Sequence, residues 1–74
     1  MLSPREYEVL RELAEDRTDR QIATRLGISE RTVRAHVSQI IHKLGVASRV
    51  GAAVAFWRGG GTANGDTPGA AAKL

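Results

Sequence analysis

The 74-residue sequence contains no cysteine, which excludes a disulfide framework and a cysteine-ligated zinc site. It also lacks any apolar run near the roughly 20 residues that a membrane-spanning helix requires, and no secretory signal opens it. Phe, Tyr and Trp occur once each, so the exposed aromatic platform of many RNA-binding domains is not predicted. We therefore expect one small soluble, cytoplasmic domain stabilised by helix packing, helix caps or a partner subunit.

Catalytic and metal-binding groups are also missing. The four glutamates between residues 4 and 15 have no nucleophile or oriented base to complete an active site. The only histidines, His36 and His42, are six residues apart, which places them roughly 240° apart around a helix axis. The sequence therefore predicts no enzyme, no cofactor and no metal ion. His36 is expected to contact phosphate or to pack half-buried, and His42 to be solvated.

The charge of +3 is distributed unevenly along the chain. The segment 4–15 carries two arginines against four glutamates, a net charge of −2. The segment 17–49 carries seven cations against two carboxylates, a net charge of +5. Solvated surfaces also scatter arginines, but this asymmetry places the positive potential where a polyanion would bind.

Two S/T-x-x-E/Q patterns predict the first two helix starts. Ser3 and Glu6 form one capping box, with Pro4 at the first helical position, and Thr18 and Gln21 form the other. We expect helices at about 4–15 and 19–26, with the acidic residues of the first on its solvent side. Helical spacing predicts that the following residues face the core: Tyr7, Leu10, Leu13, Ala14, Ile22, Ala23 and Leu26.

The stretch from Gln21 to Leu44 has the pattern of a helix-turn-helix. Gly27 allows a sharp turn, and Ser29 caps a third helix predicted at about 30–44. The apolar stripe of this helix comprises Val33, Val37, Ile40, Ile41 and Leu44. The opposite stripe comprises Arg31, Arg34, Ala35, Ser38 and His42. The polar stripe is therefore expected to face outward and to fit a DNA major groove.

Gly45 ends the third helix, and Ser48 caps a fourth at about 49–57. This helix carries two apolar stripes. We expect the stripe of Ala52, Ala53 and Phe56 to pack on the core. The second stripe comprises Val50, Val54 and Trp57. It is a candidate dimer interface, unless Trp57 folds back to complete the core.

The sequence thus predicts an all-α, four-helix domain over residues 1–58. The glycine-, alanine- and polar-rich segment 59–74 has no periodic apolar face, and we predict it to be disordered. It could be a linker, a native tail or a remnant of cloning.

Three motifs of this chain closely resemble those of the LuxR-type, or GerE-type, DNA-binding domain of bacterial transcriptional regulators. They are the opening PRE-x-x-VL, the central IA-x-x-L-x-IS-x-x-TV-x-x-H and the closing KLGV-x-SR. The similarity covers residues 2–57. It implies a four-helix domain whose third helix reads the major groove and whose fourth helix pairs two protomers on DNA.

The resemblance also implies roles for individual residues. Its base-contacting positions fall on Arg34, Ala35 and Ser38. Its phosphate-contacting positions fall on Gln21, Ser29, Arg31, Thr32, His36, Lys43 and Arg49. An arginine such as Arg34 offers a two-pronged donor to guanine O6 and N7, and the start of a helix favours a phosphate oxygen near Ser29.

Two positions depart from the family pattern. Gly51 stands where an acidic residue is usual, so the fourth helix lacks a capping box and is expected to fray without DNA or a partner. Asp16 stands where glycine is frequent after the first helix, which predicts mild backbone strain.

In this family the domain usually follows a receiver, a small-molecule sensor or a larger signalling unit, so the chain is expected to be an excised C-terminal part or a small stand-alone regulator. The rival function is a protein-interaction module whose basic surface is incidental. Such a module would more often show an apolar patch on the outer face of the third helix.

Overall fold

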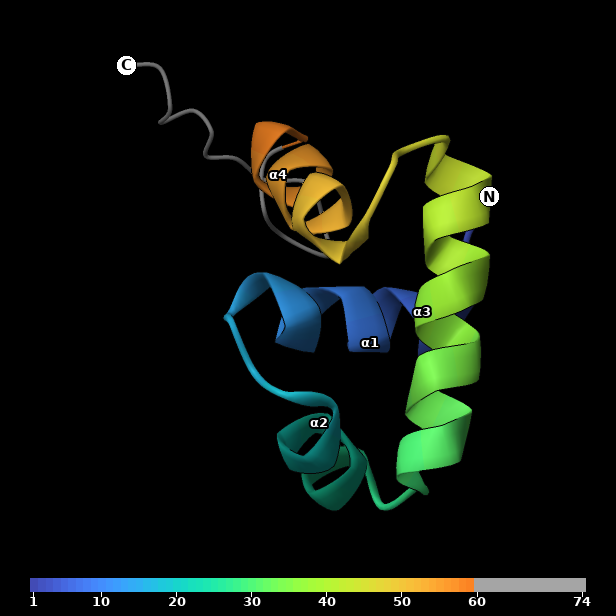
Figure 1. The fold of residues 1–74 in the computed structure, drawn as a ribbon, viewed down its shortest axis with the longest axis vertical. Coiled ribbons are helices and arrows are strands. Elements are labelled where there is room, and N and C mark those ends of the chain that lie inside the picture. The colour runs from blue at the N-terminus through green and yellow to red at the C-terminus, as the bar shows by residue number, and fades with distance from the viewer. Residues whose placement is uncertain (60–74) are drawn as a thin grey trace.

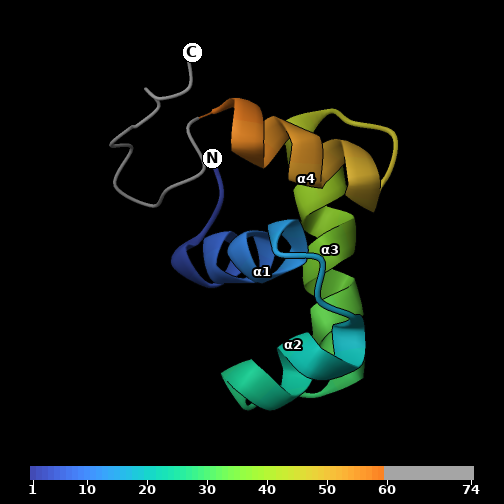
Figure 2. The same cartoon turned by 90° about the vertical axis from the view of Figure 1, so that its left-hand side faces the viewer.

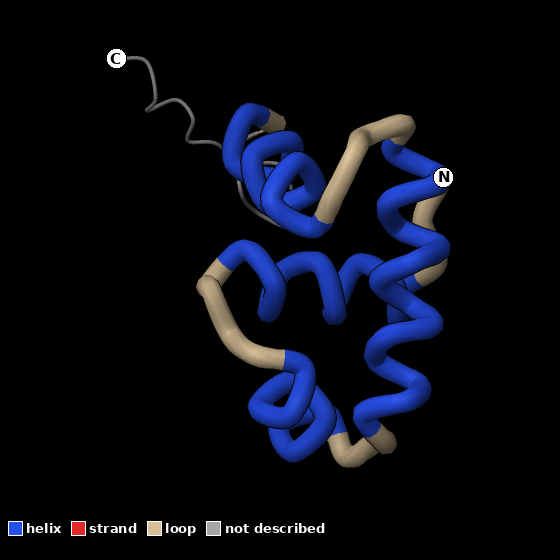
Figure 3. Tube along the Cα trace, viewed as in Figure 1, coloured by secondary structure: helices blue, strands red, loops and turns tan. Residues whose placement is uncertain are grey.

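The structure, a computed structural model, describes residues 1–59. Its four helices are α1 (Pro4–Ala14), α2 (Asp19–Leu26), α3 (Glu30–Leu44) and α4 (Arg49–Arg58). Figure 3 shows the described chain as helices joined by short loops. The predicted all-α class and the four helices are confirmed, with two helix ends differing by one residue. The predicted disordered segment lies outside the described residues except for Gly59, the C-cap of α4.

The longest helix, α3, runs along the long axis of the described domain (Figure 1). α1 crosses it near its middle, and α2 and α4 lie toward its opposite ends (Figures 1 and 2). α1 packs against all three other helices, whereas no backbone contact joins α2 and α4 within residues 1–59. α3 is therefore held by α1 near its centre and by one further helix toward each end.

The predicted capping boxes start α1 and α2. Ser3 N–H donates to Glu6 Oε1 at 2.9 Å, and Glu6 N–H donates to Ser3 Oγ at 3.1 Å. Thr18 N–H donates to Gln21 Oε1 at 2.9 Å, with the return bond to Thr18 Oγ1 at 3.1 Å. Each box satisfies backbone donors that a helix start leaves without an intrahelical acceptor. Both starts therefore follow from local sequence alone.

The caps of α3 and α4 are simpler. Ser29 Oγ accepts the N–H of Thr32 at 3.0 Å, and Ser48 Oγ accepts the N–H of Gly51 at 3.3 Å. The predicted lack of a capping box at Gly51 is confirmed. A Cβ built on Gly51 would lie 3.1 Å from Cβ of Val46, closer than ordinary van der Waals contact. Glycine at this position therefore lets the chain before α4 approach the helix closely.

The first three helices end in the same way. Asp16, Gly27 and Gly45 have φ values of 66°, 70° and 69°, in the left-handed region. In each case the next residue's N–H reaches back to the carbonyl five positions earlier, as in Val46 to Ile41 at 3.2 Å. Asp16 is the sole non-glycine residue with positive φ between residues 1 and 59. The mild strain predicted after α1 is therefore located at the backbone of Asp16.

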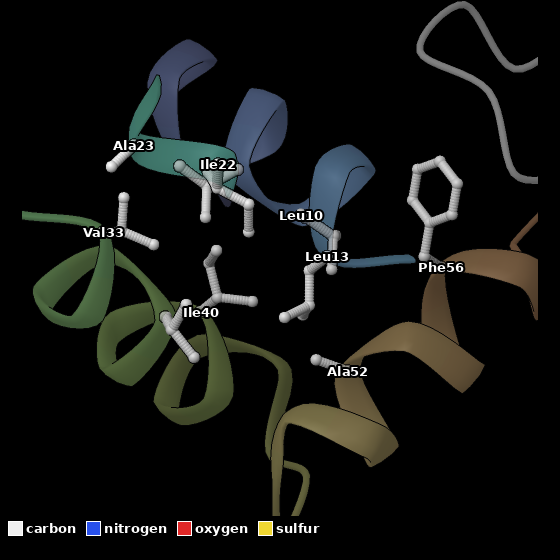
Figure 4. Close-up of a cluster of buried hydrophobic side chains, with 10 residues drawn as sticks. Leu10, Leu13, Ile22, Ala23, Val33, Ile40, Ala52 and Phe56 are labelled. Atoms are coloured by element: carbon white, nitrogen blue, oxygen red, sulfur yellow. The ribbon is translucent and has the colours of Figure 1, made fainter. Parts of the chain in front are cut away.

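The core lies where α1 crosses α3, with α2 and α4 closing it from either side (Figure 4). Its buried apolar residues are Val9, Leu10, Leu13, Ile22, Ala23, Val33, Val37, Ile40, Ala52 and Phe56. The other predicted core residues are partly buried. Val9, which the predicted stripe of α1 omitted, is fully buried.

One prediction for α1 was wrong. Glu6 was expected on the solvent side, but it is the buried charged residue of the described domain, 6% exposed. Its carboxylate is satisfied there by the backbone of Ser3 and by Nζ of Lys43, 2.8 Å away on α3. Helical spacing alone does not reveal a carboxylate whose partner lies 37 residues further along the chain.

Candidate nucleic-acid interface

The two faces of α3 separate as predicted. Val33, Val37 and Ile40 are buried against the other helices. The exposed residues of the opposite stripe are Arg31, Arg34, Ala35, Ser38 and His42. Because Val37 faces inward while Arg34 and Ser38 face outward, α3 presents a polar surface that is not used by its own domain.

The three base-contact candidates share this exposed face. The Arg34 side chain is 61% exposed, and its Nη1 lies 3.7 Å from Glu30 Oε1 one turn earlier. Exposed pairs of this kind contribute little to stability, so Glu30 holds the guanidinium only weakly. Ala35 adds no bulk, and Ser38 adds one hydroxyl one turn after Arg34. This face offers one strong bidentate donor, the Arg34 guanidinium, beside small side chains.

The start of α3 supplies a second feature suited to a polyanion. Ser29 Oγ caps Thr32 N–H and also donates to Thr32 Oγ1 at 2.9 Å. The first-turn N–H groups that this cap leaves free carry the positive end of the helix dipole. Arg31 is exposed beside them and forms no ion pair with any residue between 1 and 59. Together these groups make the strongest candidate phosphate site on α3.

Lys43 and Arg49 are engaged within the protein. Lys43 Nζ lies 2.8 Å from Glu6 Oε1, and Arg49 Nη1 lies 2.7 Å from Asp19 Oδ1. Arg49 also donates from Nη2 to the carbonyl of Arg17 at 3.4 Å. Arg49 thereby links α4 to α2, two helices without a backbone contact. The family resemblance implied that both cations contact phosphate, and the sequence gave no sign of these carboxylate partners.

The pKa of the Glu6 carboxyl is lowered, first by the hydrogen bond from Lys43 and then by the Ser3 backbone N–H. A lowered pKa in the folded state means that the ionised form favours folding. This stabilisation is present above the usual carboxyl pKa near 4.5 and is lost as the pH falls through the lowered value.

The remaining phosphate candidates are Gln21 on α2 and His36 within α3. Gln21 Oε1 accepts the Thr18 N–H, and the residue is exposed, so its amide NH₂ is accessible to an external acceptor. His36 is half-buried and His42 is exposed. The half-burial of His36 is compatible with both predictions for it, a phosphate contact and a packing residue.

Three arginines around α2 were counted in the basic segment but assigned no role. Arg17, Arg20 and Arg25, with Gln21 and Thr24, line an open hollow of about 500 Å³. Glu12 of α1 contacts two of them, Arg25 and Arg17. Burial raises the pKa of the Glu12 carboxyl, but the hydrogen bond and charge of Arg25 and the charge of Arg17 outweigh it, so that the pKa is lowered.

The second apolar stripe of α4 is exposed, as predicted. Val50, Val54 and Trp57 are 69%, 45% and 52% exposed. Trp57 does not enter the core, but its indole N–H donates to the carbonyl of Ala14 at 3.0 Å. Its ring meets Phe56 edge-on, with centroids 5.2 Å apart. The indole is therefore anchored to the end of α1 while half of its surface faces solvent.

Comparison with known proteins identifies this architecture. The profile described as "Bacterial regulatory proteins, luxR family" matches residues 1–56. The chain belongs to the luxR family. The resemblance seen in its motifs is thereby confirmed, and this luxR-family domain is a DNA-binding domain of transcriptional regulators rather than an enzyme.

This luxR-family chain is similar both to regulators several times its length and to one of similar length. It is 46% identical over 56 residues to the nitrate/nitrite response regulator protein NarP of Escherichia coli, covering 76% of this chain but 26% of NarP. It is 47% identical over 60 residues to the spore germination protein GerE of Bacillus subtilis, covering 81% of each. The E. coli regulator NarL is 43% identical over 53 residues, which cover 72% of this chain and 24% of NarL. The chain thus spans about a quarter of NarP and NarL.

No helix within residues 1–59 has the length and apolarity needed to cross a bilayer.

Proposed function

We propose that this luxR-family domain binds a specific double-stranded DNA sequence, with α3 in the major groove. The observation that carries the proposal is the exposed polar face of α3, which lies opposite its buried apolar face. A helix of this diameter fits the major groove of B-DNA, where each base pair presents a distinct pattern of donors and acceptors.

We assign the base contacts to Arg34, Ala35 and Ser38. Arg34 would pair with guanine O6 and N7, Ala35 would meet a thymine methyl, and Ser38 would accept several bases. The proposed phosphate contacts are Gln21, Ser29, Arg31, Thr32, His36 and Arg49. Lys43, the remaining position that the family resemblance assigns to phosphate, is not included because its ammonium is paired with Glu6. Arg49 would act with its charge already balanced by Asp19, so Arg31 would displace more counterion than Arg49.

We further propose that two copies pair through α4 on a two-fold symmetric operator. A self-complementary interface suits the surface formed by Val50, Val54 and Trp57, which is apolar and exposed. Pairing on DNA would place two α3 helices in successive major grooves about one helical turn apart.

The whole protein would regulate transcription in the cytoplasm, where the bacterial chromosome lies. The names of NarP and NarL describe response regulators of which this chain spans a quarter, whereas GerE is spanned over 81% of its length. This chain would accordingly be either the DNA-binding part of a larger regulator with a separate regulatory module, or a small stand-alone regulator.

A salt titration tests the proposal against the rival function of a protein-interaction module. Affinity for an operator selected from random duplex DNA should fall steeply with salt, with a log–log slope near 0.9 per phosphate contacted. Fluorescence anisotropy at several salt concentrations measures the slope. If no duplex is selected, or binding is insensitive to salt, the DNA-binding proposal for α3 is wrong.

Introducing a charge on α4 tests the pairing. Val54→Asp should leave the monomer folded, because Val54 is not part of the core, but it should abolish cooperative occupancy of two half-sites. Val54→Thr, which keeps the side-chain shape, is the matched control. The measurement is a gel-shift titration on DNA with one and with two half-sites. Wild-type cooperativity in Val54→Asp would exclude α4 as the pairing surface.

A further inference from the structure

We propose that Glu6 is a positioning residue that neutralises the charge of Lys43 and holds it away from DNA phosphates. Lys43 would then stabilise the packing of α3 on α1 instead of displacing counterions. The inference rests on the proposed DNA binding by α3. It changes the role of one cation in the predicted phosphate-contact set and gives a function to the buried carboxylate of α1.

The geometry of the pair supports this assignment. The Glu6 side chain is 8% exposed and that of Lys43 is 35% exposed. Glu6 Oε1 receives both the Ser3 N–H at 2.9 Å and Lys43 Nζ at 2.8 Å. The pair thus joins the first turn of α1 to the last turn of α3. Because the ammonium is directly compensated by a carboxylate, its net attraction for a phosphate is reduced.

A comparison within the chain shows that the helix cap does not require the charge of Glu6. The capping box of α2 uses the neutral Gln21, whose Oε1 accepts the Thr18 N–H at the same 2.9 Å. A glutamine at position 6 would therefore keep the cap of α1. What it would lose is the negative charge facing Lys43.

This arrangement lowers the sequence-independent part of DNA binding. Non-specific affinity for DNA comes almost entirely from cations that release counterions from phosphates. Withholding one cation lowers affinity for every sequence alike, while the base contacts proposed for Arg34 are unchanged. Arg31, which is exposed and has no ion pair within residues 1–59, is the matched cation that is free to act on phosphate.

The test uses the full chain and random-sequence duplex DNA, with log–log salt slopes measured for wild type and four variants. Arg31→Gln should make the slope shallower by about 0.9. Lys43→Gln should leave the slope unchanged. Glu6→Gln should make it steeper by up to about 0.9, which corresponds to about 3.5-fold in affinity over a fourfold change in salt. The double variant Glu6→Gln/Lys43→Gln should return to the wild-type slope.

Two results would overturn the proposal: a shallower slope for Lys43→Gln, as for Arg31→Gln, or a wild-type slope for Glu6→Gln. Thermal unfolding without DNA provides a separate readout of the pair. The double variant should lose less in Tm than the sum of the two single variants; additive losses would show that the pair does not form. If wild type fails to bind duplex DNA while the unfolding coupling is present, the proposed function fails and the ion pair stands.

Discussion

Replacing Ile40 by alanine is expected to remove about 2–5 kcal/mol from the free energy of unfolding. Ile40 is fully buried on α3. Figure 4 shows it within the cluster that also contains Ile22 and Leu13, from α2 and α1. The truncation removes apolar burial and leaves a cavity where three helices meet. A domain of about 60 residues has about 3–9 kcal/mol of stability in total, so the loss is a large share.

Urea denaturation followed by helical circular dichroism measures the effect. Gln39→Ala is the control, since Gln39 is the exposed neighbour on the same helix and its change should stay within about 0.5 kcal/mol. Ile40→Val should lose an intermediate amount, about 0.5–1.5 kcal/mol. A loss below about 1 kcal/mol for Ile40→Ala would mean that α3 is not close-packed against α1 and α2.

Local rules explain why the helices could be predicted from the sequence. A capping serine or threonine fixes a helix start through atoms within three residues, as Thr18 and Gln21 do for α2. A glycine at positive φ fixes the end, as Gly27 and Gly45 do. Because these interactions are short in sequence, each boundary was predicted to within one residue.

The ion pairs could not be predicted, because their partners are brought together only by packing. Glu6 and Lys43 are 37 residues apart, and Asp19 and Arg49 are 30 apart. Helical periodicity assigns a charged residue to the solvent side unless a partner is known. Periodicity therefore placed Glu6 on the solvent side, and the family resemblance assigned Lys43 and Arg49 to phosphate, although all three form ion pairs between helices.

The candidate interface was predicted in outline. The alternation of Val33 and Val37 with Arg34 and Ser38 determines which side of α3 is exposed, and the structure agrees. The contacts themselves depend on how α3 is oriented in a groove, which involves a second molecule. The assignment of bases and phosphates to particular residues therefore rests on the family resemblance and remains a proposal.

The Trp57 side chain illustrates the same limit. Its spacing with Val50 and Val54 predicted an exposed stripe, and all three are exposed. The hydrogen bond from its indole to Ala14 depends on the angle at which α4 crosses the end of α1. Helical spacing predicts the direction of a side chain but not the acceptor to which its polar edge donates.

Replacing Arg34 by alanine is expected to cost roughly 1–3 kcal/mol in affinity for the preferred site and to relax its specificity. The guanidinium is 61% exposed and its ion pair with Glu30 is long, at 3.7 Å, so little intramolecular stabilisation competes with a base. Loss of the bidentate donor leaves guanine O6 and N7 without a hydrogen-bond partner. Competition between the preferred duplex and single-base variants of it measures the change.

Two further variants separate base reading from charge. Arg34→Lys keeps the positive charge but loses the planar fork, so it should retain the salt slope while losing most discrimination at one base pair. Arg31→Ala should instead weaken binding to all sequences about equally and make the slope shallower by about 0.9. If Arg34→Ala kept the wild-type ranking of single-base variants, Arg34 would not read a base, and the specificity of α3 would have to come from Ala35, Ser38 and the shape of the DNA.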